Sequence, residues 1–255
     1  MAALLEVSES SNENNATQET AVTMSKQSIK RLQKDIVDII KHPLTEQGIY
    51  YTHDSDNFLK GYAMVIGPDD SLYRYGAYFF KFKFPTNYPF SPPKLTYLTN
   101  DGHTRFHPNL YRNGKVCISI LNTWRGEQWT SCQSIRSVLL MLITLLDNQP
   151  LLNEPGIKES HRSFIPYNKI IEYKNLEVAI SAYLENPERV GQCSSFIEIY
   201  KNYIRDHKDN ILEYVKSLEK KNKSVTTQKA SIYGMKSQLD YSILLNKCQK
   251  AIENI

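Results

Sequence analysis

Apolar residues near the start of the chain recur at helical spacing. They begin after Ser25 and fall at Ile29, Leu32, Ile36, Ile39 and Ile40. Ser25 is a suitable N-cap and Pro43 marks an end, so we predict an amphipathic helix between them. Residues 1–24 are rich in Ser, Asn, Glu and Thr without sustained periodicity, which predicts a disordered acidic tail.

The pattern then changes to that of strands. Phe58 to Ile66 ends at the turn signal Gly67-Pro68, and the aromatic stretch Tyr75 to Phe84 suits an antiparallel partner strand. Residues 85–93 contain four prolines, which exclude a helix interior and a central strand and predict an ordered loop. We predict a third strand over residues 94–98.

Helical spacing returns at Ile135 to Leu146. Apolar residues fill nearly every position there, so we expect a helix that is buried almost all round. Beyond Gly156 we predict a short helix over residues 176–184 and a long amphipathic helix or helix pair over 196–218. A linker over 221–235 and a last helix over 239–252 complete the chain.

Charge is distributed unevenly along the sequence. Residues 1–24 carry four glutamates and no Lys or Arg, whereas residues 216–255 carry eight lysines against three acidic residues. A basic segment can meet nucleic acid, a membrane or an acidic protein, or it can be a solvated lysine face. We favour the solvated face and expect neither a nucleic-acid nor a membrane partner, because few arginines alternate with aromatic residues there.

The overall composition is that of an ordinary globular domain. The longest apolar run is too short to span a bilayer, and no secretory signal is visible at the N-terminus. The four cysteines, at positions 117, 132, 193 and 248, form no Cys-x-x-Cys pair, so neither a zinc ribbon nor a redox motif is expected. We therefore predict a reduced, intracellular setting, cytoplasmic or nuclear or both.

The stretch Phe106 to Trp129 contains the candidate chemistry. A turn-like His107-Pro108-Asn109 and a second turn at Asn113-Gly114 precede Cys117 in a short apolar run. This thiol is either a nucleophile beside an amide that could stabilise an oxyanion, or a buried strand cysteine. Spacing alone favours the buried cysteine, because free cysteines are commonly buried.

The order of the parts indicates a family. A helix with Lys30-Arg31-Leu32 precedes Gly67-Pro68, the proline-aromatic loop, His107-Pro108-Asn109, Cys117 and Trp129, and an acidic residue stands before Pro155. Over residues 25–157 this chain resembles the ubiquitin-conjugating enzymes. The additional residues between Cys117 and Trp129, and the sequence Asn153-Glu154-Pro155-Gly156, most resemble the large Z-type members.

The resemblance implies an α+β ubiquitin-conjugating (UBC) fold. Its parts are an N-terminal helix, an antiparallel meander sheet and a buried central helix. The conjugating core would occupy residues 25–157 and a helical C-terminal extension residues 158–220. Residues 221–255 would be a basic linker and a possible terminal helix.

The resemblance also implies an activity that needs no cofactor and no metal. Cys117 would accept ubiquitin or a ubiquitin-like modifier from an activating enzyme as a thioester and pass it to a protein substrate or a ligase. Asn109 would donate to the oxyanion, tie the loop, or do both. His107, whose other role would be a general base, would support the loop. Glu154 would orient the incoming lysine, its alternative being a solvated loop acid.

The same resemblance assigns partner contacts. Lys30 and Arg31 would meet the activating enzyme, or else form an ordinary solvated helix face. The ligase-facing loops would contain four residues: Phe90, Trp129, Thr130 and Ser131. Two departures from the family pattern bear on these roles: Ser119 stands where many members have an acid, and Thr130-Ser131 where Ser-Pro is common.

Two other functions compete with conjugation. One is a conjugating-like scaffold that binds ubiquitin or a ligase without transfer. The other is a cysteine hydrolase that uses Cys117 and His107. For the extension over residues 158–220 we expect a role in choosing the activating enzyme or the modifier, since residues 196–218 are amphipathic.

Overall fold

The computed structural model describes residues 24–255. The predicted disordered tail therefore lies, except for Met24, outside the described residues. Helix α1 (Lys26–Lys41) begins where the sequence indicated, because the side chain of Ser25 accepts a hydrogen bond from the backbone N–H of Ser28 at 3.0 Å. Leu32 and Ile39 are buried on its inner face.

A four-stranded antiparallel meander follows α1. Its strands, in sheet order, are β1 (Ile49–His53), β2 (Lys60–Ile66), β3 (Ala77–Lys83) and β4 (Lys94–Tyr97). The meander and three of its strands are confirmed. Strand β1 was missed because it lies at the sheet edge, where Ile49 alone is buried and no alternation marks it.

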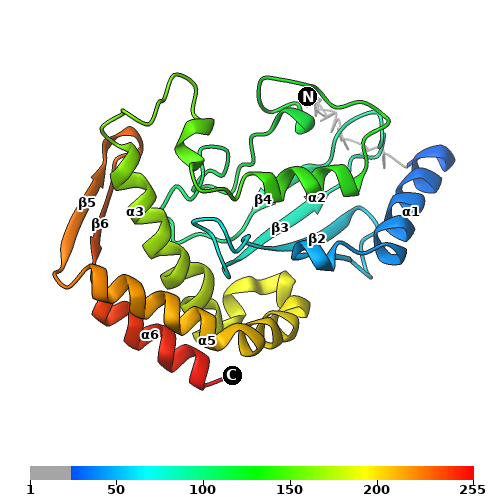
Figure 1. The fold of residues 1–255 in the computed structure, drawn as a ribbon. Helices are drawn as coiled ribbons and strands as arrows, with labels where there is room; N and C mark the ends of the chain where they lie inside the picture. Colours follow the sequence, from blue (N-terminus) through cyan, green and yellow to red (C-terminus); the bar gives the residue numbers. More distant parts are fainter. Residues whose placement is uncertain (1–23) are drawn as a thin grey trace, which may run out of the picture.

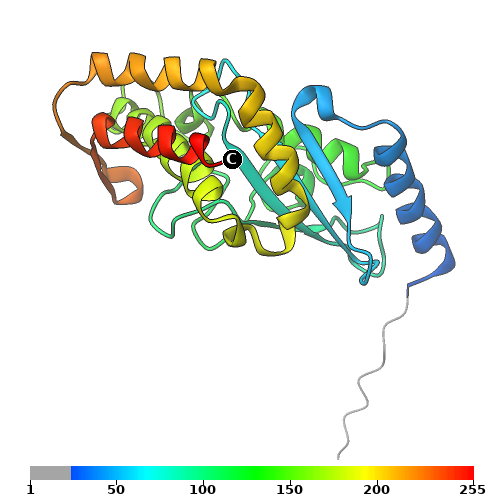
Figure 2. The ribbon, with the colours of Figure 1, turned by 90° about the horizontal axis from the view of Figure 1, so that it is seen from below.

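The two inner strands pack against apolar side chains on both faces. Ala63, Val65 and Phe80 point into a core shared with α1 and with helix α2 (Ile135–Thr144). The alternate residues Met64 and Phe79 point into a second core built by the C-terminal extension. Figures 1 and 2 show helices on both sides of the sheet. This explains why β2 and β3 read as continuous apolar runs.

Helix α2 is less enclosed than its sequence suggests. Ile135, Val138 and Leu142 lie on the buried face, but Leu140 is 40% exposed. The expectation of a helix buried almost all round is therefore wrong. Its outer side faces solvent: helical spacing marks the buried side correctly, but the apolar residues at the remaining positions are not all buried.

The extension is helical, as predicted, but its helices differ in length from the predicted ones. α3 (Phe164–Lys174) continues without a break through a π-helical segment (Asn175–Ala182) into α4 (Tyr183–Glu185). A 3-10 segment (Pro187–Phe196) then leads to the long helix α5 (Ile197–Lys221). The predicted helix over 176–184 is thus the second half of a longer one, which ends before Pro187 as expected.

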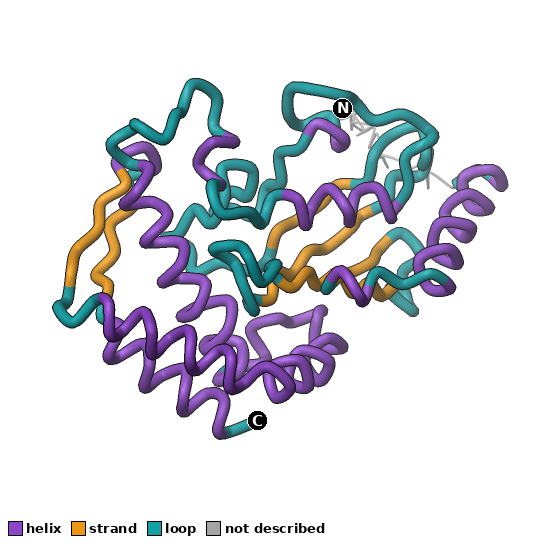
Figure 3. Tube along the Cα trace, viewed as in Figure 1, coloured by secondary structure: helices purple, strands orange, loops and turns teal. Residues whose placement is uncertain are grey.

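The prediction of a linker over residues 221–235 is wrong. Strands β5 (Thr226–Ala230) and β6 (Met235–Leu239) form a separate antiparallel hairpin, visible beside α3 in Figure 3. Strand β6 alternates buried and exposed residues, but most of β5 is exposed, so the pair looked like a polar linker. The last helix is confirmed as α6 (Tyr241–Glu253), with Asp240 as its N-cap.

Two broad exclusions hold for residues 24–255. None of their helices combines the length and apolarity that a membrane crossing demands. Nor do three His, Cys, Asp or Glu side chains gather there as metal ligands would.

Candidate active site

Asn109 and Cys117 hold each other across a tight hairpin-like loop. The backbone N–H of Cys117 donates to the carbonyl of Asn109 at 2.9 Å, and the side-chain amide of Asn109 donates back to the Cys117 carbonyl. The turn between them needs Gly114, which has φ +84°. A Cβ there would lie 2.9 Å from the Tyr97 carbonyl oxygen. The sequence positions of Asn109 and Cys117 therefore meet in space.

Asn109 itself has unused hydrogen-bonding capacity. An amide nitrogen carries two N–H donors, and the bond to the Cys117 carbonyl uses one. The Asn109 Oδ1 atom is buried without a hydrogen-bond partner among the described residues. The loop-tying bond is thus present, and the second N–H of the side-chain amide takes no part in it.

Cys117 is 2% exposed and precedes a short 3-10 segment, Ser119–Leu121. The other buried thiols have a different environment: burial raises the pKa of Cys193 to about 12 and that of Cys248 to about 11. Both stay protonated and are poor nucleophiles at neutral pH. Cys132 is exposed. Cys117 lies in a loop, and its carbonyl accepts a hydrogen bond from the side-chain amide of Asn109.

His107 has little capacity to act as a base. Its ring is fully buried, and its Nδ1 atom accepts a hydrogen bond from the Asn109 backbone N–H at 3.0 Å. Burial, assisted by the positive charge of Arg105, lowers the pKa of His107 to about 3. The imidazole is therefore neutral and its basic nitrogen is already occupied, as loop support requires.

Glu154 is half-buried and bonded to a residue from the far end of the chain. Its Oε2 atom accepts a hydrogen bond from the hydroxyl of Tyr233 at 2.5 Å. The adjacent Pro155 lines a cavity of about 640 Å³ together with residues of the loop that follows Cys117: Asn122, Thr123, Trp124, Arg125 and Gln128. The neighbouring Asn153 is exposed, has an amide in place of a carboxyl group and donates to the Pro150 carbonyl, so Glu154 is the acid at this position.

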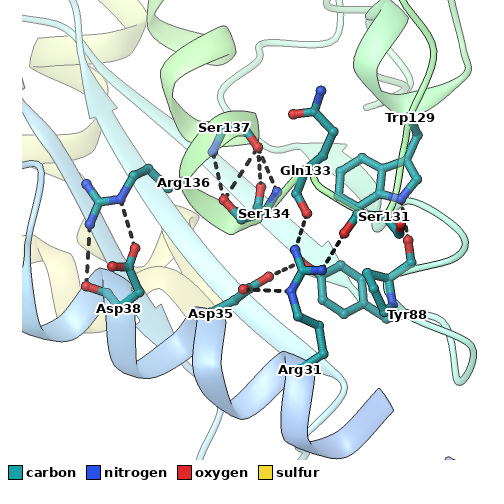
Figure 4. A network of polar contacts seen from close by, with 11 residues as sticks. Arg31, Asp35, Asp38, Tyr88, Trp129, Ser131, Gln133, Ser134, Arg136 and Ser137 are labelled. Carbon is teal, nitrogen blue, oxygen red and sulfur yellow. Dashed lines mark hydrogen bonds and ion pairs between the residues drawn. The ribbon is translucent and has the colours of Figure 1, made fainter. Parts of the chain in front are cut away.

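Arg31 joins α1 to the loop that follows Trp129 (Figure 4). Its guanidinium donates to Asp35 at 3.0 Å, to the carbonyl of Gln133 at 2.5 Å and to the carbonyl of Ser131. Lys30, by contrast, is exposed. The two predicted activating-enzyme contacts therefore differ, because only the charge of Lys30 is free. Arg31 instead links α1 to the predicted ligase-facing surface.

The four predicted ligase-facing residues divide in the same way. Phe90 is 62% exposed, and Thr130 and Ser131 are exposed. Trp129 is buried, and its indole N–H donates to the Pro89 carbonyl at 2.6 Å (Figure 4). Trp129 thus ties the two loops together.

Sequence reasoning missed Tyr233, Arg105 and Arg112. These residues connect the C-terminal hairpin to the candidate site. Gly234 and the alternation of β6 are signals that could have located the hairpin. Nothing in the sequence indicated that its turn reaches Glu154.

The comparisons with known proteins identify a family. Residues 31–173 match the family model described as "Ubiquitin-conjugating enzyme". The chain belongs to the ubiquitin-conjugating enzyme family. It is 38% identical over 188 residues to ubiquitin-conjugating enzyme E2 Z of Danio rerio, covering 70% of this chain and 57% of the relative.

A second relative of the same kind matches a similar share of the chain. The human E2 Z protein is 36% identical over 194 residues, which cover 72% of this chain and 54% of that protein. The solved structure of human ubiquitin-conjugating enzyme E2 G1 is 29% identical, with a TM-score of 0.41, covering 48% of this chain and 94% of that one. The matched region spans less than two thirds of the E2 Z relatives. The Z-type resemblance and the UBC fold class expected from the sequence are confirmed.

Proposed function

We propose that this chain carries ubiquitin, or a ubiquitin-like modifier, as a thioester on Cys117. The Cys117 thiolate attacks the carbonyl carbon of a modifier already bound as a thioester to an activating enzyme. A new C–S bond forms, and the activating enzyme's thiolate leaves. The observation that carries this proposal is the pair of bonds between Asn109 and Cys117, because it holds an amide beside the sulfur-bearing residue.

Transfer to an acceptor is the second step. A lysine amine attacks the thioester carbonyl, and the tetrahedral oxyanion collapses with loss of the Cys117 thiolate. Where a ligase cysteine is the acceptor, a thiolate attacks instead. The free N–H of Asn109 would stabilise the oxyanion, and Glu154 would orient the lysine and favour its deprotonation. Because Cys117 is 2% exposed, we expect the loops around it to shift when a partner binds.

The remaining residues would serve recognition and support. His107 holds the loop through its bond to the Asn109 backbone. Lys30 and Arg31 would contribute to contacts with the activating enzyme, and Arg31 would also hold the ligase-facing loop beyond Trp129. Phe90, Thr130 and Ser131 would meet a ligase, and residues 158–220 would help to select the activating enzyme or modifier. No cofactor is needed, because the activating enzyme consumes the ATP.

The test is incubation with an activating enzyme, ATP and ubiquitin or a panel of ubiquitin-like modifiers. We expect an adduct that thiols cleave, and a thiol-resistant ester in the Cys117→Ser variant. Cys132→Ala is the matched control and should charge normally. Absence of any adduct with every modifier would favour the scaffold function instead.

The hydrolase function makes a separate prediction. It requires cleavage of ubiquitin esters or peptide esters without ATP. The neutral His107, with its Nδ1 atom already accepting a hydrogen bond, argues against that chemistry.

A further inference from the structure

The hairpin turn after β5 brings Tyr233 to the candidate acid. Tyr233 lies outside residues 31–173, which match the family model, and 79 positions beyond Glu154 in the sequence. Its hydroxyl nevertheless donates to Glu154 Oε2 at 2.5 Å. Glu154 Oε1 accepts no hydrogen bond from the residues that the structure describes, so one carboxylate oxygen is held and the other is free.

Three polar contacts hold this turn in place. The guanidinium of Arg112 donates to the Tyr233 carbonyl at 2.8 Å. The hydroxyls of Ser163 and Ser231 lie 3.2 Å apart, and the Ile232 backbone N–H donates to the Ser163 hydroxyl at 3.4 Å. The turn is therefore attached both to the loop before Cys117, through Arg112, and to the start of α3, through Ser163.

Arg105 fixes the ring of Tyr233 against that same loop. Its guanidinium lies 4.9 Å from the centre of the Tyr233 ring and 3.4 Å from that of Tyr111. The same guanidinium donates to the His107 carbonyl at 3.2 Å and to the Pro108 carbonyl. One cation thus joins the hairpin to the segment that leads into Asn109.

The electrostatics fix the direction of the hydrogen bond. Burial, and then the neighbouring Glu154, raise the pKa of Tyr233 above its ordinary value. The phenol stays protonated at neutral pH, so it donates and the carboxylate accepts. A donor at one oxygen restricts the rotation of the carboxylate and leaves its charge available at the other oxygen.

We propose that Tyr233 is a positioning residue for Glu154, and that the C-terminal hairpin is therefore part of the acceptor side of the site. Tyr233 does not touch the reacting atoms. It orients the free carboxylate oxygen towards the lysine that attacks the Cys117 thioester. This inference rests on the function proposed above.

The test measures discharge of a purified thioester to free lysine in a single turnover, so that charging does not enter the rate. Tyr233→Phe keeps the ring and removes the hydroxyl. We expect discharge to slow about tenfold to hundredfold, the value of a hydrogen bond to a charged group. Tyr111→Phe is the matched control: its ring contacts the same Arg105, and its hydroxyl bonds to no described residue, so its rate should be unchanged.

Two further readouts separate positioning from a merely structural role. In a Glu154→Gln background, which should itself discharge slowly, Tyr233→Phe should have no additional effect, because the two residues act as one unit. Discharge to hydroxylamine should be nearly unaffected by Tyr233→Phe, since this nucleophile is unprotonated at neutral pH and needs no deprotonation.

The outcomes also separate this inference from the proposed function. If the wild-type chain forms no thioester, the proposed function fails and takes this inference with it. If the chain charges but Tyr233→Phe discharges at the wild-type rate, the inference alone is overturned. Additive losses with Glu154→Gln, or an equal loss with hydroxylamine, would assign Tyr233 a structural role and overturn it as well.

Discussion

The two sides of the candidate site are held in place in different ways. On the nucleophile side, Asn109 binds Cys117, eight residues away, and His107 binds the backbone of Asn109, two residues away. On the acceptor side, Glu154 is held by Tyr233, 79 residues further along the chain. Short-range bonds assemble the first side, whereas the second needs the whole extension to be folded.

This difference explains what a motif can and cannot convey. The nucleophile side can be read as a short pattern in the sequence because its contacts close within one loop. The acceptor side has no such pattern, because the hairpin that contains Tyr233 packs on α3, while α5 and α6 pack on the second face of the sheet (Figure 1). Disturbing each side should therefore have different consequences.

The largest effect in this comparison is expected on the nucleophile side. Asn109→Ala removes the candidate oxyanion donor, and discharge of the loaded thioester should slow by about 100- to 1000-fold. Single-turnover discharge to lysine measures this rate. A variant that fails to charge or to fold would show instead that Asn109 serves the loop alone.

A smaller effect is expected on the stability of the protein, which should depend on pH through His107 of the same loop. Since the pKa of His107 is lowered to about 3 in the folded state, the unfolded chain binds a proton first as the pH falls below about 6.5. Through this group alone, the free energy of unfolding should thus be about 2 kcal/mol lower at pH 5 than at pH 7.5.

Denaturant unfolding at several pH values measures this effect. His107→Gln should flatten the slope between about pH 6.5 and pH 4. His103→Gln, at an exposed position of the preceding loop, should leave the slope unchanged. Equal slopes in wild type and His107→Gln would contradict a lowered pKa of His107 in the folded state.

The smallest effect is expected on stability, from a hydrogen bond between the extension and the nucleophile loop. The buried hydroxyl of Tyr167 on α3 donates to the Arg105 carbonyl at 2.8 Å. Tyr167→Phe should lower the free energy of unfolding by about 1 kcal/mol. Tyr97→Phe is the matched control, since its buried hydroxyl has no partner among the described residues and its loss should cost nothing. Equal losses in the two variants would mean that the Tyr167 bond adds no stability.

The sequence supported much of the fold and half of the site. Helical spacing located α1, α2, α5 and α6, and strand patterns located β2, β3 and β4. The edge strand β1 and the hairpin strand β5 were missed for the same reason: most of their side chains are not buried, so no periodicity marks them. Leu140 was placed in the core, although 40% of it is exposed, because an apolar residue does not indicate which side of a helix it occupies.

By itself, the sequence located the candidate nucleophile side through its family resemblance: His107, Asn109, the glycine turn and Cys117. The hydrogen bonds among these residues join positions at most eight apart. It also pointed to Glu154. Only the tertiary structure decided that Arg31 binds the loop beyond Trp129, and that Tyr233 holds Glu154. Such contacts join residues far apart in the sequence, so their existence depends on how two cores pack against one sheet, which no local pattern encodes.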